Sequence, residues 1–282
     1  MSQATVPETA QRSPEGAIPE AWPLALRLKL GSIHPGGTMG SSLLLSGLRV
    51  QSGDRVVDLA PGSGETALLT TRENLHSWIG ICRDDAEAER VVKAVPGPSV
   101  HTQIAAPDAT GLPDASASVV MAEGLLFGIP DDRKAAVLRE SARILRPEGR
   151  LGLHELCIRD VGLSHATTTS IREWMREPEN GGMQPLTQAE WREYVASAGL
   201  EIVGFTQMEL EIPRPRDFVR QLGLRRGLGV VLRASGETGA VTRQSLKVLY
   251  RQRGRFSAVV IIARRPMVGA LRGNAAVGDE VG

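Results

Sequence analysis

The chain has 282 residues, of which 41% are hydrophobic and 23% charged, and its formal net charge is +1. This composition is typical of a globular domain, and the near-neutral charge disfavours a dedicated nucleic-acid binder. Only two cysteines occur, Cys82 and Cys157, and both lie in apolar runs, so neither a disulfide framework nor a cysteine metal site is expected. The first twenty residues lack the basic start and apolar run of a secretory signal, and no later run approaches the ~18 apolar residues of a membrane span. We therefore expect a cytoplasmic protein with no membrane partner and no metal.

Strand-like and helix-like segments alternate through most of the chain. Strands are predicted at 55–60, 77–82, 100–104, 118–122, 150–158, 201–212 and 256–264, and helices at 65–73, 84–95, 131–145, 170–177 and 188–198. Pro147 stops the third helix, and Thr187 with Glu190 forms a capping box before the last. The alternation predicts an α/β, Rossmann-like fold: seven mostly parallel strands, helices on both faces, and a helical insertion before the last strand.

The ends of the chain differ in composition from its centre. Residues 1–20 and 267–282 are polar, rich in small residues and without periodicity, so both are predicted to be disordered tails. We predict one domain over residues 21–266, with insertion or cap segments at about 160–186 and 214–255.

A glycine-bearing loop follows the first strand. It runs Asp58-Leu59-Ala60-Pro61-Gly62-Ser63-Gly64, and glycine allows the backbone to turn with positive φ and to approach a ligand closely. Taken alone, this pattern also fits a plain turn between strand and helix. It fits a dinucleotide loop as well, because Ala67 stands where such loops allow glycine or alanine.

Three motifs in the correct order resemble those of class I S-adenosylmethionine-dependent methyltransferases. The loop resembles their V-L-D-x-G-x-G-x-G, with Ala60 replacing the first glycine. Residues 107–116 resemble their G-D-A-x-x-L-P-F stretch, and residues 139–151 their E-x-x-R-V-L-K-P-G-G-x-L, with Glu148 at a usual glycine. The resemblance implies this fold and S-adenosylmethionine as cofactor.

The resemblance also implies residues for the cofactor. Asp58, Ala60, Gly62 and Gly64 would line the loop, and Asp108 with the Ala109 amide would contact adenine. The acidic residue that normally binds the ribose is replaced by Cys82. Asp84 is the nearest carboxylate that could substitute, although it could equally serve only to start the next helix.

Polar residues stand at the carboxyl ends of the fourth and fifth strands, where open α/β sheets bind ligands. Glu123 is predicted to face the cofactor or the acceptor, because a buried acid is costly without a charged partner. His154 is a candidate base, with a buried structural histidine as the alternative. His34 is predicted to cap a turn rather than to act in catalysis. The segments His34–Gly37, Ala122–Gly124 and Leu153–Leu156 resemble H-P-G-G, G-E-A and I-H-E-L of a bacterial methyltransferase group, which names no substrate.

Four functions follow from these observations. Methyl transfer to a small molecule is the first. The acceptor would be anionic if the many arginines of 214–255 bind it rather than forming a solvated face. The second is a catalytically silent binding or regulatory protein, motivated by Ala60, Cys82 and Glu148. A nicotinamide-dependent oxidoreductase and a nucleic-acid methyltransferase are weaker alternatives, and a monomer and a homodimer both stay open.

Overall fold

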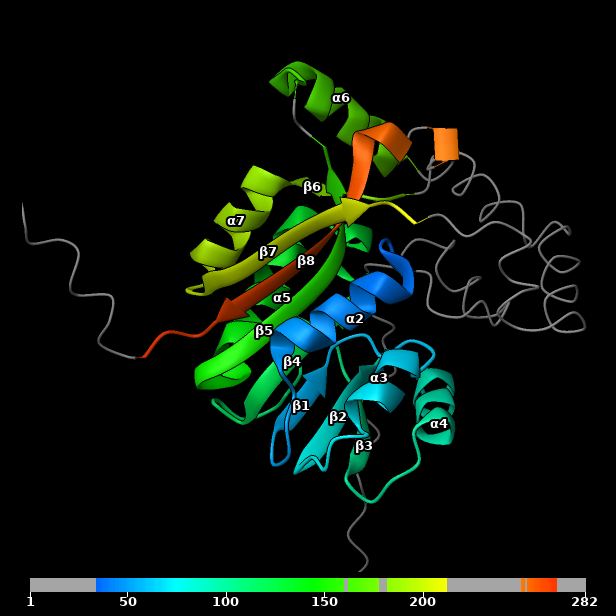
Figure 1. Cartoon of the computed structure of the whole chain (residues 1–282), viewed down its shortest axis with the longest axis vertical. Coiled ribbons are helices and arrows are strands. Elements are labelled where there is room, and N and C mark those ends of the chain that lie inside the picture. The colour runs from blue at the N-terminus through cyan, green and yellow to red at the C-terminus, as the bar shows by residue number, and fades with distance from the viewer. Residues whose placement is uncertain (1–33, 160–161, 178–181, 212–249, 252, 268–282) are drawn as a thin grey trace, which may run out of the picture.

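The computed structural model describes residues 34–159, 162–177, 182–211, 250–251 and 253–267. Its centre is a sheet with the strand order β3-β2-β1-β4-β5-β8-β7 (Figure 1). The parallel strands are β1 Arg55–Asp58, β2 Ser77–Cys82, β3 Val100–Ile104, β4 Ala117–Glu123 and β5 Leu145–Ile158. β8 Phe256–Arg264 pairs antiparallel with β5 and with β7 Glu201–Glu209. The prediction of a seven-stranded, mostly parallel sheet is confirmed, and a two-residue strand, β6 Leu186–Thr187, adds to β5.

Helices cover both faces of the sheet. On one face lie α2 Gly37–Leu48, α3 Glu65–Thr70 and α4 Asp85–Ala94, and on the other lie α5 Asp131–Ile144 and α7 Gln188–Ser197 (Figure 1). Successive strand residues point to opposite faces of the sheet. Val56 packs in the core on the side of α2, α3 and α4, and Val57 packs in the core on the side of α5 and α7. The capping box of Thr187 and Glu190 is present at the start of α7.

A smaller apolar cluster lies at the carboxyl end of β5. It joins α6 His165–Arg176 to the short helix η1 Leu126–Gly128 and to the start of β8, just after the short helix η4 Arg253–Arg255. The members of this cluster include Phe127, Ile158, Met175 and Phe256. α6 begins at His165 rather than at the predicted Ser170, because Ser164 caps it by accepting the Thr167 amide.

One helix was not predicted. The sequence of α2, GTMGSSLLLSGL, is rich in glycine and serine, which disfavour helix in isolation. The structure explains these glycines by packing: a Cβ on Gly47 would lie 2.6 Å from Ile262 of β8, and one on Gly40 would overlap the His154 ring.

The predicted tail 1–20, the predicted tail 267–282 apart from Met267, and most of the 214–255 insertion lie outside the described residues. Within the described part of the chain, no helix has the length and apolar character needed to span a bilayer.

Candidate functional site

The predicted cofactor loop follows β1 at the carboxyl edge of the sheet. Its backbone turns through Gly62, with φ of 56°, and Gly64, with φ of 82°. The Gly64 amide donates to the Pro61 carbonyl (2.8 Å). A Cβ on Gly64 would lie 3.0 Å from the Ala94 Cβ, so α4 packs directly against this residue. Ala60 is not among the described residues with positive φ, and its methyl group therefore meets no backbone strain at the position where the family has glycine.

Polar groups of this loop are buried without full hydrogen bonding. The Asp58 carboxylate accepts the Ala60 amide (3.1 Å), and burial, partly opposed by this bond, raises its pKa to about 8. The Ser63 hydroxyl is buried and has no hydrogen-bond partner among the described residues. Buried polar atoms in native proteins are nearly always paired, so these groups indicate a place for a polar ligand.

Glu123 ends β4 within a cluster of polar side chains. It is 4% exposed, accepts from Thr66 (2.5 Å) and from His154 Nδ1 (3.0 Å), and lies 3.4 Å from His34 Nε2. Burial by itself raises its pKa, but the facing His34 and the bonds from His154 and Thr66 more than offset this, lowering the pKa to about 2. Glu123 is therefore a carboxylate at neutral pH.

His154 is fully buried, and both of its ring nitrogens are used. Nε2 accepts the Gly36 amide (3.0 Å), so the proton lies on Nδ1 and is donated to Glu123. This leaves the ring no free lone pair. The ligand-type atoms of His34, Glu123 and His154 lie within 4.8 Å of one another, a spacing that a metal could also use. If His154 Nδ1 bound a metal, Nε2 would carry the proton, and its N–H would face the Gly36 N–H. The hydrogen bonds of His154 therefore favour a hydrogen-bonded cluster over a metal site.

Glu155 holds the loop that follows Glu123. Its buried carboxylate accepts the amides of Leu125, Leu126 and Phe127 at 2.8–3.0 Å. Burial raises its pKa to about 7 in spite of these bonds. Glu155 thus fixes the start of η1, and its carboxylate is occupied by these amides rather than directed at a substrate.

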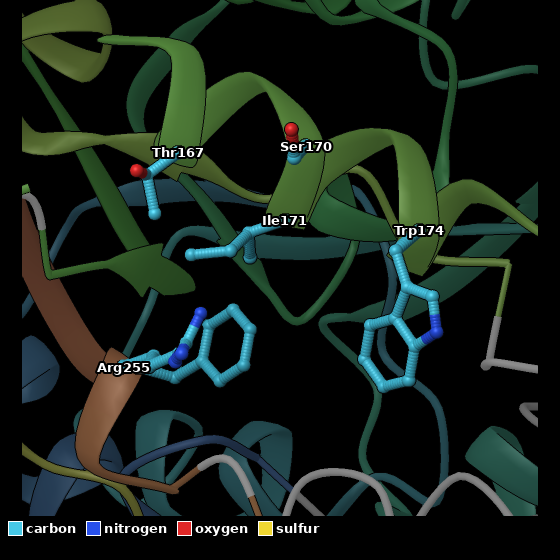
Figure 2. Close-up of a pocket in the computed structure, with 6 residues that line it drawn as sticks. Thr167, Ser170, Ile171, Trp174 and Arg255 are labelled. Atoms are coloured by element: carbon cyan, nitrogen blue, oxygen red, sulfur yellow. The ribbon is translucent and has the colours of Figure 1, made fainter. Parts of the chain in front are cut away.

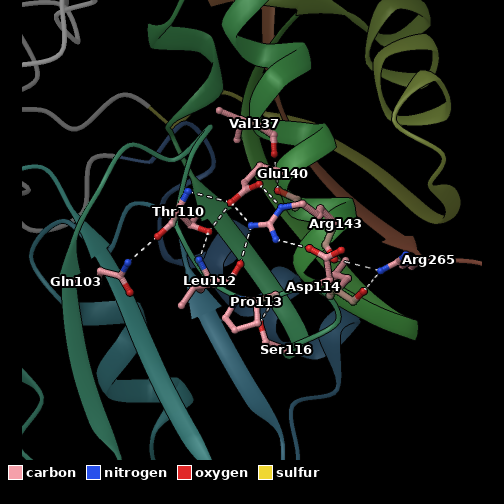
Figure 3. A network of polar contacts seen from close by, with 12 residues as sticks. Gln103, Thr110, Leu112, Pro113, Asp114, Ser116, Val137, Glu140, Arg143 and Arg265 are labelled. Atoms are coloured by element: carbon pink, nitrogen blue, oxygen red, sulfur yellow. Dashed lines mark hydrogen bonds and ion pairs between the residues drawn. The ribbon is translucent and has the colours of Figure 1, made fainter.

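The predicted adenine loop is tied to α5. Asp108 pairs with Arg133 through two bonds of 2.9 Å, and the Ala109 amide donates to the Ala106 carbonyl (3.0 Å). Figure 3 shows the network behind this loop: Glu140 accepts from the amide and hydroxyl of Thr110 and pairs with Arg143. Arg143 also binds Asp114 and the Leu112 carbonyl.

The two ribose candidates lie in different environments. Cys82 is fully buried in the core on the α2–α4 side of the sheet, and burial raises the pKa of its thiol to about 12. Asp84 is exposed, and its Oδ1 caps α4 by accepting the Glu87 amide (2.7 Å). Asp84 therefore performs the helix-starting role.

Sequence reasoning missed three members of this site. Ser63 lies between the two predicted glycines, and Thr66 is the second residue of α3. His34 does form the expected turn, since its carbonyl accepts the Gly37 amide (2.9 Å), but its ring also meets Glu123. No local pattern reveals that contact, because the two residues are far apart in the sequence.

Comparison with known proteins identifies the family and the fold. The methyltransferase-domain family matches residues 37–204. A 27-O-demethylrifamycin SV methyltransferase of Amycolatopsis mediterranei is 30% identical over 158 residues, and the match spans 55% of this chain and 56% of that enzyme's length.

Two solved structures share the fold. The [4+2]-cyclase SpnF has a TM-score of 0.66 at 19% identity, covering 88% of this chain and 93% of its own. The geranyl diphosphate C-methyltransferase of Streptomyces coelicolor A3(2), solved with Mg²⁺, geranyl diphosphate and S-adenosyl-L-homocysteine, has a TM-score of 0.56 at 16% identity, covering 81% and 79%. Because the family match spans more than half of the chain and agrees with the sheet order and the loop after β1, this protein belongs to the class I S-adenosylmethionine-dependent methyltransferases.

Proposed function

We propose that the protein transfers a methyl group from S-adenosylmethionine to a small-molecule acceptor that carries an anionic group. The observation that carries the methyl-transfer assignment is the loop after β1, where two left-handed glycines flank a buried hydroxyl that has no hydrogen-bond partner in the described part of the chain. When bound, the cofactor supplies an electrophilic methyl group on a sulfonium sulfur.

The residues present fit this cofactor. Asp58, Ala60, Gly62, Ser63 and Gly64 would hold its amino-acid end, because the loop offers backbone approach and under-paired polar groups. Asp108 would receive adenine, whereas the Ala109 amide, which the sequence also predicted to contact adenine, already donates to the Ala106 carbonyl. The carboxylate of Asp108 keeps acceptor capacity beyond its two bonds to Arg133. For the ribose, the exposed Asp84 is favoured over the buried Cys82.

We assign Glu123 to the sulfonium side of the site. It is a buried carboxylate at the end of β4, where ligands of open α/β sheets bind, and a cationic ligand would offset its desolvation. For His154, the contacts support a positioning role: its ring joins Glu123 to the Gly36 amide and has no lone pair left to accept a proton.

The anionic part of the proposal depends on a cavity of about 300 Å³ beneath α6. Figure 2 shows Ile171 and Trp174 on one side and Arg255 on the other, with the hydroxyls of Thr167 and Ser170 nearby. Arg255, which lines the cavity, precedes Phe256, and Phe256 pairs with Ile158 of β5. Ile158 lies four residues beyond His154 on the same strand. The cavity therefore lies ~13 Å along the sheet from the cluster around Glu123 and His154. An elongated acceptor with an apolar body and a terminal carboxylate or phosphate fits this layout.

Calorimetry with S-adenosylhomocysteine tests the cofactor, and a dissociation constant in the micromolar range or tighter is expected. Turnover is then measured on a panel of carboxylated acceptors and their methyl esters. Arg255→Ala is expected to raise KM for the acids about tenfold and to leave the esters unchanged. Arg253→Ala, on the same short helix, is the matched control.

Two results would contradict this function. The absence of binding heat would remove the cofactor assignment. Tight binding without any methylated product would favour a silent regulatory protein. Equal turnover of acids and esters by both arginine variants would remove the anionic acceptor alone.

A further inference from the structure

We propose that His34 is the base of this enzyme: its Nδ1 takes the acceptor's proton, while Glu123 orients the ring from the other side. This assignment rests on the proposed methyl transfer and adds a catalytic residue that neither the sequence motifs nor the comparisons assign.

The geometry begins with the two nitrogens of the His34 ring. Nε2 lies 3.4 Å from Glu123 Oε2. Glu123 is an acceptor only, so Nε2 carries the proton and faces it. The lone pair of the neutral ring is then on Nδ1.

Nδ1 is the atom that lacks a partner. It is buried, and no described residue donates a hydrogen bond to it. The side chain is only 11% exposed, so water does not readily satisfy this atom. Leaving a buried acceptor unpaired is costly, and its presence points to a ligand proton as the missing partner.

The position of the ring suits a base for this reaction. His34 precedes α2 and faces Glu123 at the end of β4, and its electrostatic neighbours include Glu65, the residue that follows Gly64 of the cofactor loop. The ring therefore lies between the cofactor loop and the end of β4. His154 cannot fill this role, because Gly36 and Glu123 occupy both of its nitrogens.

The step balances without a further reactant. The acceptor's heteroatom forms the bond to the methyl carbon, and the methyl–sulfur bond breaks with its electron pair left on sulfur. The proton of the heteroatom moves to His34 Nδ1, giving an imidazolium that Glu123 stabilises across Nε2. Solvent removes this proton after product release.

Burial keeps His34 neutral before the reaction. Burial lowers its pKa below the usual 6.5, Glu123 and Glu65 act in the opposite direction, and His154 lowers it further. At neutral pH the Nδ1 lone pair is therefore available. Its availability is lost only as the pH falls through this lowered pKa.

Nitrogen NMR of the ¹⁵N-histidine-labelled protein tests the tautomers without any acceptor. Long-range ¹H–¹⁵N spectra at pH 7, with and without S-adenosylhomocysteine, are expected to show His34 neutral with its proton on Nε2, and His154 with its proton on Nδ1. His34→Gln and His154→Gln assign the signals. An Nδ1-protonated or charged His34 at pH 7 would overturn the proposal.

Kinetics tests the role itself, using whichever panel acceptor turns over fastest. His34→Gln, whose amide can still face Glu123, is expected to lower kcat/KM about 100-fold and to remove the acidic limb of the pH profile. The dissociation constant for S-adenosylhomocysteine should change by less than about twofold. The control is His76→Gln, at an exposed position just before β2, and it should behave as wild type.

Each failure has a distinct signature. Loss of cofactor binding in the wild type contradicts the methyltransferase site, whereas intact binding with an unchanged His34→Gln pH profile contradicts His34 alone. Activity that is lost on chelation with EDTA and restored by a divalent ion would also overturn the proposal, because the ring would then be a ligand.

Discussion

Glu148 has a backbone conformation that is unfavourable for a residue with a side chain. Its φ is 63°, in the left-handed region that favours glycine, and the related motif has glycine at this position. Its carboxylate pairs with Arg264 at 3.0 Å, but both groups are largely exposed, so the pair contributes little stability.

We expect Glu148→Gly to be more stable than Glu148→Ala by about 1 kcal/mol in free energy of unfolding, measured by urea denaturation. Both variants lose the ion pair, so their difference reports the backbone alone. Equal stabilities would show that this turn carries no strain.

The buried Glu123 predicts a pH-dependent stability. Its pKa in the folded protein is about 2, below the usual 4.5, so it contributes stability that is fully present above pH 4.5 and is lost as the pH falls toward 2. We expect the wild type to lose on the order of 2–3 kcal/mol over this interval through Glu123. Glu123→Gln should show a correspondingly flatter curve, and parallel curves for the two proteins would contradict the prediction.

At the scale of elements, α2 illustrates how packing can override propensity. Glycine disfavours helix, yet Gly40 and Gly47 let α2 approach β5 and β8 closely. The central strands were predictable because their nearly continuous apolar runs reflect burial on both faces of the sheet. α2 was not predictable, because its glycines are required by contacts with side chains on strands that are distant in the sequence.

Gly40→Ala should therefore destabilise the protein, although replacing glycine by alanine in a helix usually stabilises it. In an exposed helix this change stabilises by about 1 kcal/mol. Here the new methyl group would overlap the fully buried His154 ring, so we expect a loss of at least about 2 kcal/mol in unfolding free energy. Ser42→Ala, at an exposed position of the same helix, is the control. A stabilised Gly40→Ala would refute the close packing.

The network between α5 and the adenine loop makes a second prediction at this scale. Glu140→Ala leaves the Thr110 amide and hydroxyl without their acceptor. We expect about 2 kcal/mol of lost stability and at least tenfold weaker binding of S-adenosylhomocysteine by calorimetry. Arg139→Ala, on the exposed side of α5, should leave both unchanged. Weaker stability with unchanged affinity would mean that the loop does not bind the cofactor.

In the molecule as a whole, the fold brings the loop after β1 and the carboxyl ends of β4 and β5 to one edge of the sheet. β1, β4 and β5 are neighbours and parallel, so the loop after β1 and the ends of β4 and β5 meet. A ligand bound at this edge touches elements from both halves of the described domain and should stabilise it as a unit.

S-adenosylhomocysteine at 100 times its dissociation constant should stabilise the protein by about 2.7 kcal/mol, raising Tm by roughly 5–10 °C. Asp108→Ala should give a smaller shift at the same concentration, and Asp132→Ala, exposed on α5, the wild-type shift. The measurement is a calorimetric melting scan. An unchanged Tm for the wild type would contradict cofactor binding.

Local sequence was enough to predict the strands and most of the helices along the chain, the loop after β1 and the family resemblance, because periodicity, glycines and short motifs are local properties of the chain. Only the tertiary structure decided which polar side chains meet. It gave both nitrogens of His154 hydrogen-bond partners, tied Asp108 to Arg133, and placed His34 against Glu123. These contacts join residues from different elements, and such pairings depend on how the elements pack rather than on any pattern within one segment.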